Sequence, residues 1–304
     1  MTGLRLRAVD VALMAVGVLG VSMSGPLIAS MAAVPALAIA FWRTAIATMF
    51  IAPMAGATRR TAIRAVSRAD LWLTTLAGLA LAAHFAAWVT SLKLTSVASS
   101  TALVCLQAGW VVLFVWLAGE RPDRRTGIGL VVCLVGVVVV TGVDFTVSPE
   151  ALLGDLLALV GGIGSAAYMI IGGRVRQRMD TTVYTLLCYA ACSIALVAAC
   201  LVGAVPLGGY ASQDWVRLVA LAVASQLLGH SVFNHLLATT SPMVVSLALL
   251  LEVPGAALLA AWFLGQQPPL GALVGLAVIV VGMACVIVGN RPAAREHSLQ
   301  APLD

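Results

Sequence analysis

Long apolar stretches, separated by short polar segments, dominate the pattern of the chain. Charged residues, glycines and prolines divide it into ten apolar segments, each about long enough to cross a bilayer as a helix. The segments lie at about 9–30, 35–53, 71–90, 97–118, 126–143, 153–173, 182–204, 215–237, 243–264 and 270–290. We therefore predict an all-α, polytopic membrane protein with ten transmembrane helices. Nine spans remain the alternative, because the eighth segment carries several polar residues.

Composition excludes most other classes of protein. Hydrophobic residues make up 62% of the 304 positions and charged residues only 10%, whereas average soluble domains carry roughly 25% charged residues. A soluble enzyme, a nucleic-acid-binding protein and a disordered regulator are all disfavoured. Ten spans of about 20 residues occupy about two-thirds of the chain, so no extramembrane domain is expected.

The basic residues are sorted between the two sides of the predicted bundle. Of the 17 Lys and Arg residues, fourteen lie in loops on one predicted side, Lys93 and Arg217 lie on the other, and Arg43 lies within a span. The positive-inside rule places both termini in the cytoplasm, with the first segment as an uncleaved helix and 292–304 as a cytoplasmic tail. The net charge of +5 is thus a topology signal and not a sign of nucleic-acid binding.

Residues 146 positions apart repeat along the chain. The matched pairs are His84 with His230, Gly119 with Gly265, Pro122 with Pro268, Gly129 with Gly275, and Gly136 with Gly282. This offset indicates two homologous five-span halves, residues 1–146 and 147–291. Because five is odd, the second half enters the membrane in the opposite sense, as in secondary transporters whose binding site lies at midplane between inverted repeats.

Several motifs resemble one family of transporters. The stretches that carry the resemblance are Ala38-Ile39-Ala40-Phe41-Trp42-Arg43, Thr95-Ser96-Val97-Ala98-Ser99-Ser100, Gly119-Glu120-Arg121 and Glu252-Val253-Pro254. Over residues 9–290 the chain resembles the EamA-type branch of the drug/metabolite transporter superfamily, which are ten-helix proteins built from two inverted repeats. Two departures are Gly265-Gln266, where Gly-Glu is usual, and Gln107-Ala108, where a proline often follows. The resemblance implies transport of amino acids, amines or related metabolites, often as export.

Two charged residues lie deep inside predicted spans. Arg43 is expected to face the bundle interior, because a charge in the bilayer core is costly. It is either an anchor for a substrate carboxylate or phosphate, or a fixed structural partner. Glu252, two positions before Pro254, either exchanges protons in a coupling or gating role or forms a permanent ion pair with Arg43. Pro26, after Gly25, predicts a kink in the first span that serves gating.

Polar residues in other spans complete the candidate site. Gln226, His230 and Asn234 follow one another at four-residue spacing, which places them on one face of an α-helix. A subset of the family that the chain resembles has the same Gln-x3-His-x3-Asn stretch. We expect this face to line a central cavity, although hydrogen bonding between helices is the alternative. The further expected cavity residues are His84, Trp88 and Gln107.

Other sites are not indicated. All six cysteines fall within predicted spans with no adjacent metal-ligand set, so neither a metal nor a cofactor is expected. Glycines on the fifth and tenth spans predict close helix packing, either within one chain or in a homodimer.

These features favour a secondary transporter of a small molecule, working by alternating access in the plasma membrane, exporting its substrate and coupled to protons. A channel or a non-transporting scaffold is the alternative. An intramembrane enzyme is disfavoured because the sequence lacks the motifs of hydrolases and metalloproteases, and no ATP-binding loop occurs.

Overall fold

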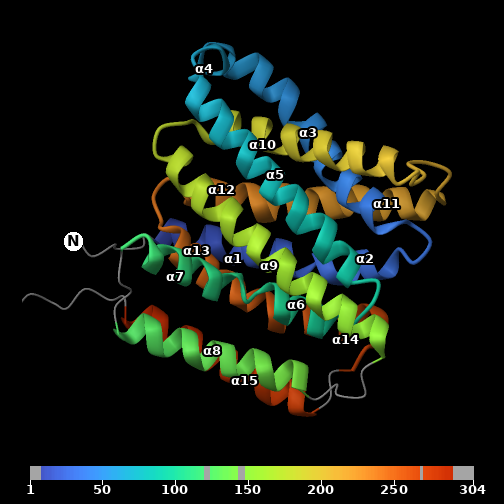
Figure 1. Ribbon diagram of the computed structural model, residues 1–304, viewed down its shortest axis with the longest axis vertical. Helices are drawn as coiled ribbons and strands as arrows, with labels where there is room; N and C mark the ends of the chain where they lie inside the picture. Colours follow the sequence, from blue (N-terminus) through green and yellow to red (C-terminus); the bar gives the residue numbers. More distant parts are fainter. Residues whose placement is uncertain (1–7, 120–123, 143–147, 268–269, 290–304) are drawn as a thin grey trace, which may run out of the picture.

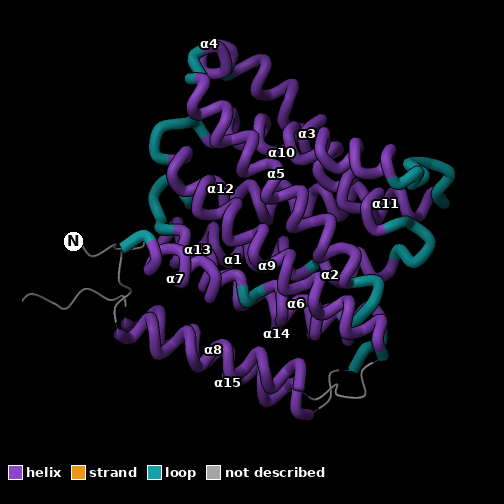
Figure 2. Tube along the Cα trace, viewed as in Figure 1, coloured by secondary structure: helices purple, strands orange, loops and turns teal. Residues whose placement is uncertain are grey.

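The computed structural model describes residues 8–119, 124–142, 148–267 and 270–289, and every regular element in these ranges is a helix (Figures 1 and 2). The first half contains α1 (Ala8–Ser22), α2 (Ser24–Ser30), α3 (Ala36–Thr58), α4 (Arg60–Arg64), α5 (Arg68–Ser91), α6 (Val97–Val104), α7 (Gln107–Leu117) and α8 (Arg124–Gly142). The second half contains α9 (Pro149–Arg176), α10 (Thr181–Val202), α11 (Ser212–Leu221), the π-helix η1 (Ala222–His230), α12 (Ser231–Leu236), α13 (Pro242–Ala248), the 3-10 turn η2 (Leu249–Leu251), α14 (Glu252–Leu264) and α15 (Leu270–Gly289).

The predicted all-α membrane class is confirmed. Within the described ranges, eight helical segments are long and apolar enough to cross a membrane, each at the position of a predicted span. The predicted fifth and tenth spans coincide with α8 and α15, so the total of ten stays a prediction. The proposed boundary at 146/147, Glu120, Arg121 and the tail 292–304 lie outside the described residues.

Serine side chains fix where several helices begin. Ser67, Ser96, Ser148 and Ser241 are extended N-cap residues, and each hydroxyl accepts a hydrogen bond from the backbone N–H three positions later. Such a cap satisfies one of the donors that the first helical turn leaves free. The short polar segments of the sequence therefore define the helix ends as well as the loops.

Most of the large helix contacts join one half to the other. The helix α5 packs along α9, α1 packs along η1, α3 packs against α10, and α8 packs along α15. Glycines permit several of these approaches: a Cβ atom at Gly164 of α9 would lie only 3.0 Å from the carbonyl oxygen of Ala80 in α5. The interior between the halves is thus built from both of them.

The helices α8 and α15 lie side by side (Figure 1), and their glycine contacts are symmetric. A Cβ at Gly136 would lie 2.8 Å from the carbonyl oxygen of Gly275, and one at Gly282 would lie 2.8 Å from that of Gly129. These two contacts exchange when 146 is added to or subtracted from each residue number. The glycine faces, whose packing partner the sequence left open, therefore pack against each other within one chain.

Breaks interrupt three of the long segments near their middles. The first span breaks at Met23, between α1 and α2, three residues before Pro26. The ninth breaks at η2, where Pro254 leaves the carbonyl of Leu250 without its usual helical donor. The fourth breaks between α6 and α7, and there Cys105 Sγ lies 3.5 Å from the carbonyl oxygen of Leu249. The breaks of the fourth and ninth spans therefore meet.

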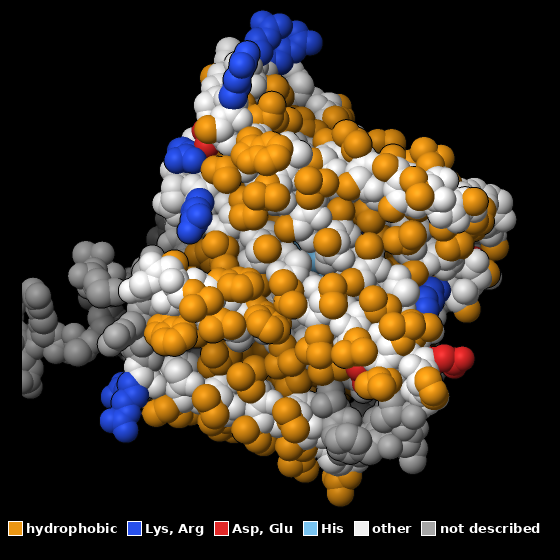
Figure 3. All heavy atoms as spheres, viewed as in Figure 1, with side chains coloured by type: hydrophobic (Ala, Val, Ile, Leu, Met, Phe, Trp, Pro, Cys, Tyr) orange, Lys and Arg blue, Asp and Glu red, His pale blue; other side chains and the backbone are white. Residues whose placement is uncertain are grey.

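Apolar side chains cover the visible face of the helices, whereas most Lys and Arg side chains gather along one edge and around α4 (Figure 3). Leu79, Val138, Leu201 and Trp262 are among the exposed large apolar residues. A soluble monomer seldom exposes such a continuous apolar surface, whereas lipid tails solvate it.

Candidate functional site

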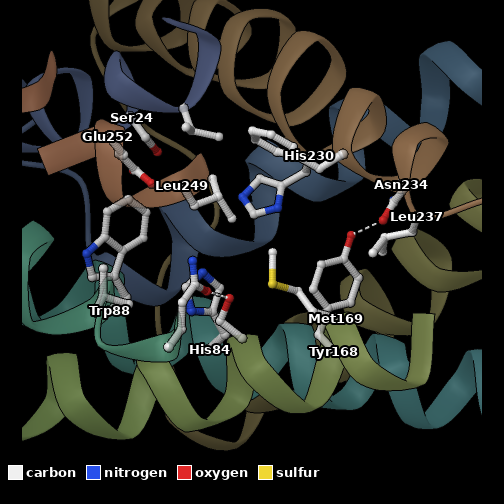
Figure 4. A pocket seen from close by; sticks show the side chains of 15 residues that line it. Ser24, His84, Trp88, Tyr168, Met169, His230, Asn234, Leu237, Leu249 and Glu252 are labelled. Carbon is white, nitrogen blue, oxygen red and sulfur yellow. Dashed lines mark hydrogen bonds between the residues drawn. The ribbon is translucent and has the colours of Figure 1, made fainter. Parts of the chain in front are cut away.

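A central cavity lies between the two halves. Its lining comes from Val21, Ser24, His84, Trp88, Val104, Gln107, Ser165, Tyr168, Met169, His230, Phe233, Asn234, Leu237, Leu249 and Glu252 (Figure 4). These residues belong to the predicted spans one, three and four of the first half and to their counterparts six, eight and nine. The space left open is about 20 Å³, which is about enough for one water molecule. The open space between these side chains is therefore narrow in this conformation.

The two histidines related by the 146-residue offset meet in the cavity. The rings of His84 and His230 lie 6.3 Å apart, and Phe85 contacts His230 edge-on at 5.2 Å. The Nδ1 atom of His84 lies 2.9 Å from the carbonyl oxygen of Gly161 on α9. The ring of His84 also stacks on Trp88 at 5.7 Å. The structure therefore brings His84, Trp88 and His230 together on the cavity wall.

Two hydrogen-bonded pairs connect the walls of the cavity. Ser165 donates to Gln107 Oε1, and Tyr168 donates to Asn234 Oδ1 (Figure 4). The amide of Asn234 also donates to Thr185, over 3.4 Å. The Ser165–Gln107 bond joins the two halves across the cavity, whereas the bonds of Asn234 stay within the second half.

Arg43 lies behind the cavity wall and does not line it. Its side chain is fully buried, its Nε donates to Gln226 Oε1 over 3.0 Å, and its Nη1 donates to Ser24 Oγ over 3.1 Å. The guanidinium also stacks on Phe85, with Cζ 3.9 Å from the ring centroid. The prediction that Arg43 faces the bundle interior is met, whereas the expected place on the cavity surface is corrected.

Gln226 is the second correction: it does not line the cavity, and it belongs to the π-helix η1. The sequence argument placed Gln226, His230 and Asn234 on one α-helical stripe, but the backbone N–H of Ser231 bonds to the carbonyl of Gln226, five residues earlier. His230 and Asn234 line the cavity, whereas Gln226 is fully buried against Arg43.

Glu252 lines the cavity at the first residue of α14. Within the described ranges no ion pair joins it to Arg43, so the hypothesis of a permanent pair is not met in this conformation. Pro254 follows the break at η2. Pro26 lines a different cavity of about 310 Å³, together with Met23 and Arg217.

Nine of the fifteen cavity residues were not predicted from the sequence, and four of them lie on α9 and in η2. Ser165, Tyr168 and Met169 on α9 and Leu249 in η2 all line the cavity. The offset contained a usable signal, because Tyr168 and Met169 are the counterparts of Ser22 and Met23 at the break of the first span. Two other tryptophans of the spans lie away from the cavity: Trp42 packs on Trp215, and Trp110 stacks on Phe114.

The described part of the chain contains no group of three His, Cys, Asp or Glu side chains able to hold a metal ion. The cavity instead offers hydrogen-bonding groups, aromatic rings and one carboxylate. Such a lining can bind and orient a small polar or amphipathic molecule.

Comparison with known proteins agrees with this architecture. No curated protein matches the sequence, but chains of solved structures do. One of these, titled "Crystal structure of protein", is 21% identical, has a TM-score of 0.76, and is matched over 94% of this chain and 99% of its own. At this identity the match shows a shared fold. The sequence model of one family matches twice, at residues 10–142 and 152–288. The chain therefore belongs to the EamA-like transporter family, and it is a membrane transporter of the drug/metabolite transporter superfamily.

Proposed function

We propose that the protein is a secondary transporter that moves one small metabolite at a time through the central cavity by alternating access. The observation that carries the proposal is the origin of the cavity lining, since equivalent spans of the two halves supply it. Two similar halves around one site can exchange packings and so open the site to either side.

The membrane, the orientation, the substrate class, the direction of transport and the proton coupling are part of the same proposal. The sorted basic residues support a plasma membrane protein with both termini in the cytoplasm and with inverted halves. The family supports an amino acid, an amine or a related compound as substrate, and export as the direction. Glu252 on the cavity wall is the candidate for proton coupling.

Counterflow in proteoliposomes tests the mechanism. Vesicles are loaded with an unlabelled candidate metabolite, and uptake of the labelled compound is followed against protein-free vesicles. A carrier is expected to give flux that saturates and is stimulated by substrate on the other side. Flux that rises in proportion to concentration, without such stimulation, would show a channel, and no flux of any candidate would favour a scaffold.

A further inference from the structure

The buried contacts of Arg43 leave part of its hydrogen-bonding capacity unused. Two of its nitrogens are engaged by Ser24 and Gln226, and Phe85 covers one face of the guanidinium. The third nitrogen, Nη2, is buried and has no hydrogen-bond partner. A guanidinium is charged throughout the accessible pH range, so this atom is a cationic donor without an acceptor.

A second unpartnered donor belongs to the side chain beside it. Gln226 turns its Oε1 to Arg43 Nε, so its amide nitrogen Nε2 is directed elsewhere, and this atom is also buried without a partner. On the cavity wall, Trp88 Nε1 is a third buried donor of the same kind. The region therefore has an excess of donors, and the carboxylate of Glu252 on the cavity wall forms no ion pair with Arg43 in the described ranges.

Burying such groups is unfavourable unless something compensates them. An unsatisfied buried donor destabilises a fold, and an unpaired buried charge does so more strongly. In the described ranges no carboxylate forms an ion pair with Arg43. A planar oxyanion supplies what is missing, since its two oxygens match two N–H donors and its charge matches the guanidinium.

We propose that Arg43 Nη2 and Gln226 Nε2 form the subsite that binds a carboxylate group of the transported molecule. This inference rests on the proposed transport function and adds a substrate class to it. Ser24 and His230 link the subsite to the cavity, since both line the cavity, Ser24 contacts Arg43, and His230 contacts Phe85, on which Arg43 stacks. Movement at the break beside Met23 would join the subsite to the cavity.

Matched pairs of ligands test the charge requirement. Purified protein in detergent is heated with a panel of amino and other carboxylic acids, each paired with its uncharged carboxamide. We expect at least one acid to raise the melting temperature while its amide does not, and Arg43→Met to weaken apparent acid binding about thirty-fold or more. Acids that act no better than their amides, or an Arg43→Met variant that responds like the wild type, would overturn the proposal.

A second variant tests the subsite without any ligand. Gln226→Glu places a carboxylate permanently beside Arg43, so it is expected to raise the melting temperature and to remove the response to acids. Gln213→Glu is the matched control, because Gln213 is exposed on the same span and is expected to change neither. A Gln226→Glu protein that melts no higher than the wild type would count against an anion site.

The outcomes separate this inference from the proposed function. If amines or amides show saturable counterflow that Arg43→Met leaves unchanged, the carboxylate subsite is wrong and the carrier stands. If acids bind as expected but no compound shows counterflow, the subsite stands and the carrier is wrong.

Discussion

The paired histidines show how single residues of the two halves share one site. His84 and His230 occupy equivalent positions 146 residues apart, and both rings face the cavity. His84 is held by the carbonyl of Gly161, whereas His230 makes ring contacts with Phe85 and Tyr168. His230 is therefore the freer of the two to contact a substrate.

His230→Ala is expected to reduce counterflow about ten-fold or more, because it removes a ring and its hydrogen-bonding groups from the cavity wall. Size-exclusion chromatography in detergent should show a folded protein. The control is His235→Ala, which changes an exposed histidine of the same span. Wild-type counterflow in His230→Ala would show that the ring does not contact the substrate.

Glu252→Gln tests the proposed proton coupling. The variant cannot carry a proton at this position, so we expect counterflow without a pH gradient to persist while acceleration by a pH gradient is lost. Internal vesicle pH is recorded with a trapped dye during substrate movement. Glu150→Gln, which changes an exposed acidic residue in the first turn of α9, should keep both activities. Undiminished gradient-driven transport in Glu252→Gln would remove this residue as a proton carrier.

At the scale of elements, hydropathy predicted where the long helices lie but not where they break. Charges and serine caps mark the helix ends, so the predicted and observed spans differ by only a few residues. The break of the ninth span has a local cause, because Pro254 follows it in the sequence. No proline lies at Cys105–Leu106, where the fourth span breaks against η2 of the other half, so a single stretch of sequence does not reveal that break.

The π-helix η1 could not be predicted from the sequence either, because a contact with another helix helps to form it. The carbonyl of Gln226 accepts hydrogen bonds from the Tyr189 hydroxyl over 3.1 Å and from the Ser231 hydroxyl over 3.0 Å. Tyr189 lies on another helix, so part of what holds the wide turn is a tertiary contact. The structure places His230 and Asn234 at the cavity and Gln226 against Arg43.

The glycine contact between α8 and α15 gives a prediction about stability. Gly136→Ala is expected to destabilise the protein by about 1–3 kcal/mol, because its Cβ would press on the backbone of α15. The control Gly127→Ala lies on the same helix with nothing within 4 Å of the new Cβ, so it should leave the melting temperature unchanged or raise it, since alanine favours helix. Equal melting temperatures for the two variants would contradict the observed packing.

At the scale of the whole molecule, ion pairs join the halves at one end of the bundle. Arg178 pairs with Asp70 at 2.7 Å, and Arg59 pairs with Asp180 at 3.4 Å. Each pair links a residue of the first half to one in the turn between α9 and α10. These pairs have to separate when this end of the cavity opens.

Arg178→Gln is expected to shift the equilibrium toward opening at this end by about 1 kcal/mol or less, because partly exposed pairs contribute little. The counterflow rate should change by about five-fold or less. The wild-type rate should respond more to salt than the variant rate, since salt screens the pair. Arg174→Gln changes an exposed arginine in the last turn of α9, for which the described residues show no ion pair, and is the control. Identical salt responses in wild type and Arg178→Gln would show that the pair does not restrain opening.

The symmetric packing of α8 on α15 has a consequence for how such a chain can arise. The residues of α15 that surround Gly136 are the counterparts, 146 positions later, of the residues of α8 that surround Gly282. The two helices therefore contact each other through equivalent surfaces. A surface that fits a rotated copy of itself needs no covalent link between its two sides. Two separate five-helix polypeptides of one sequence could form this joint, so a duplicated and fused gene would inherit a working interface at the moment of fusion.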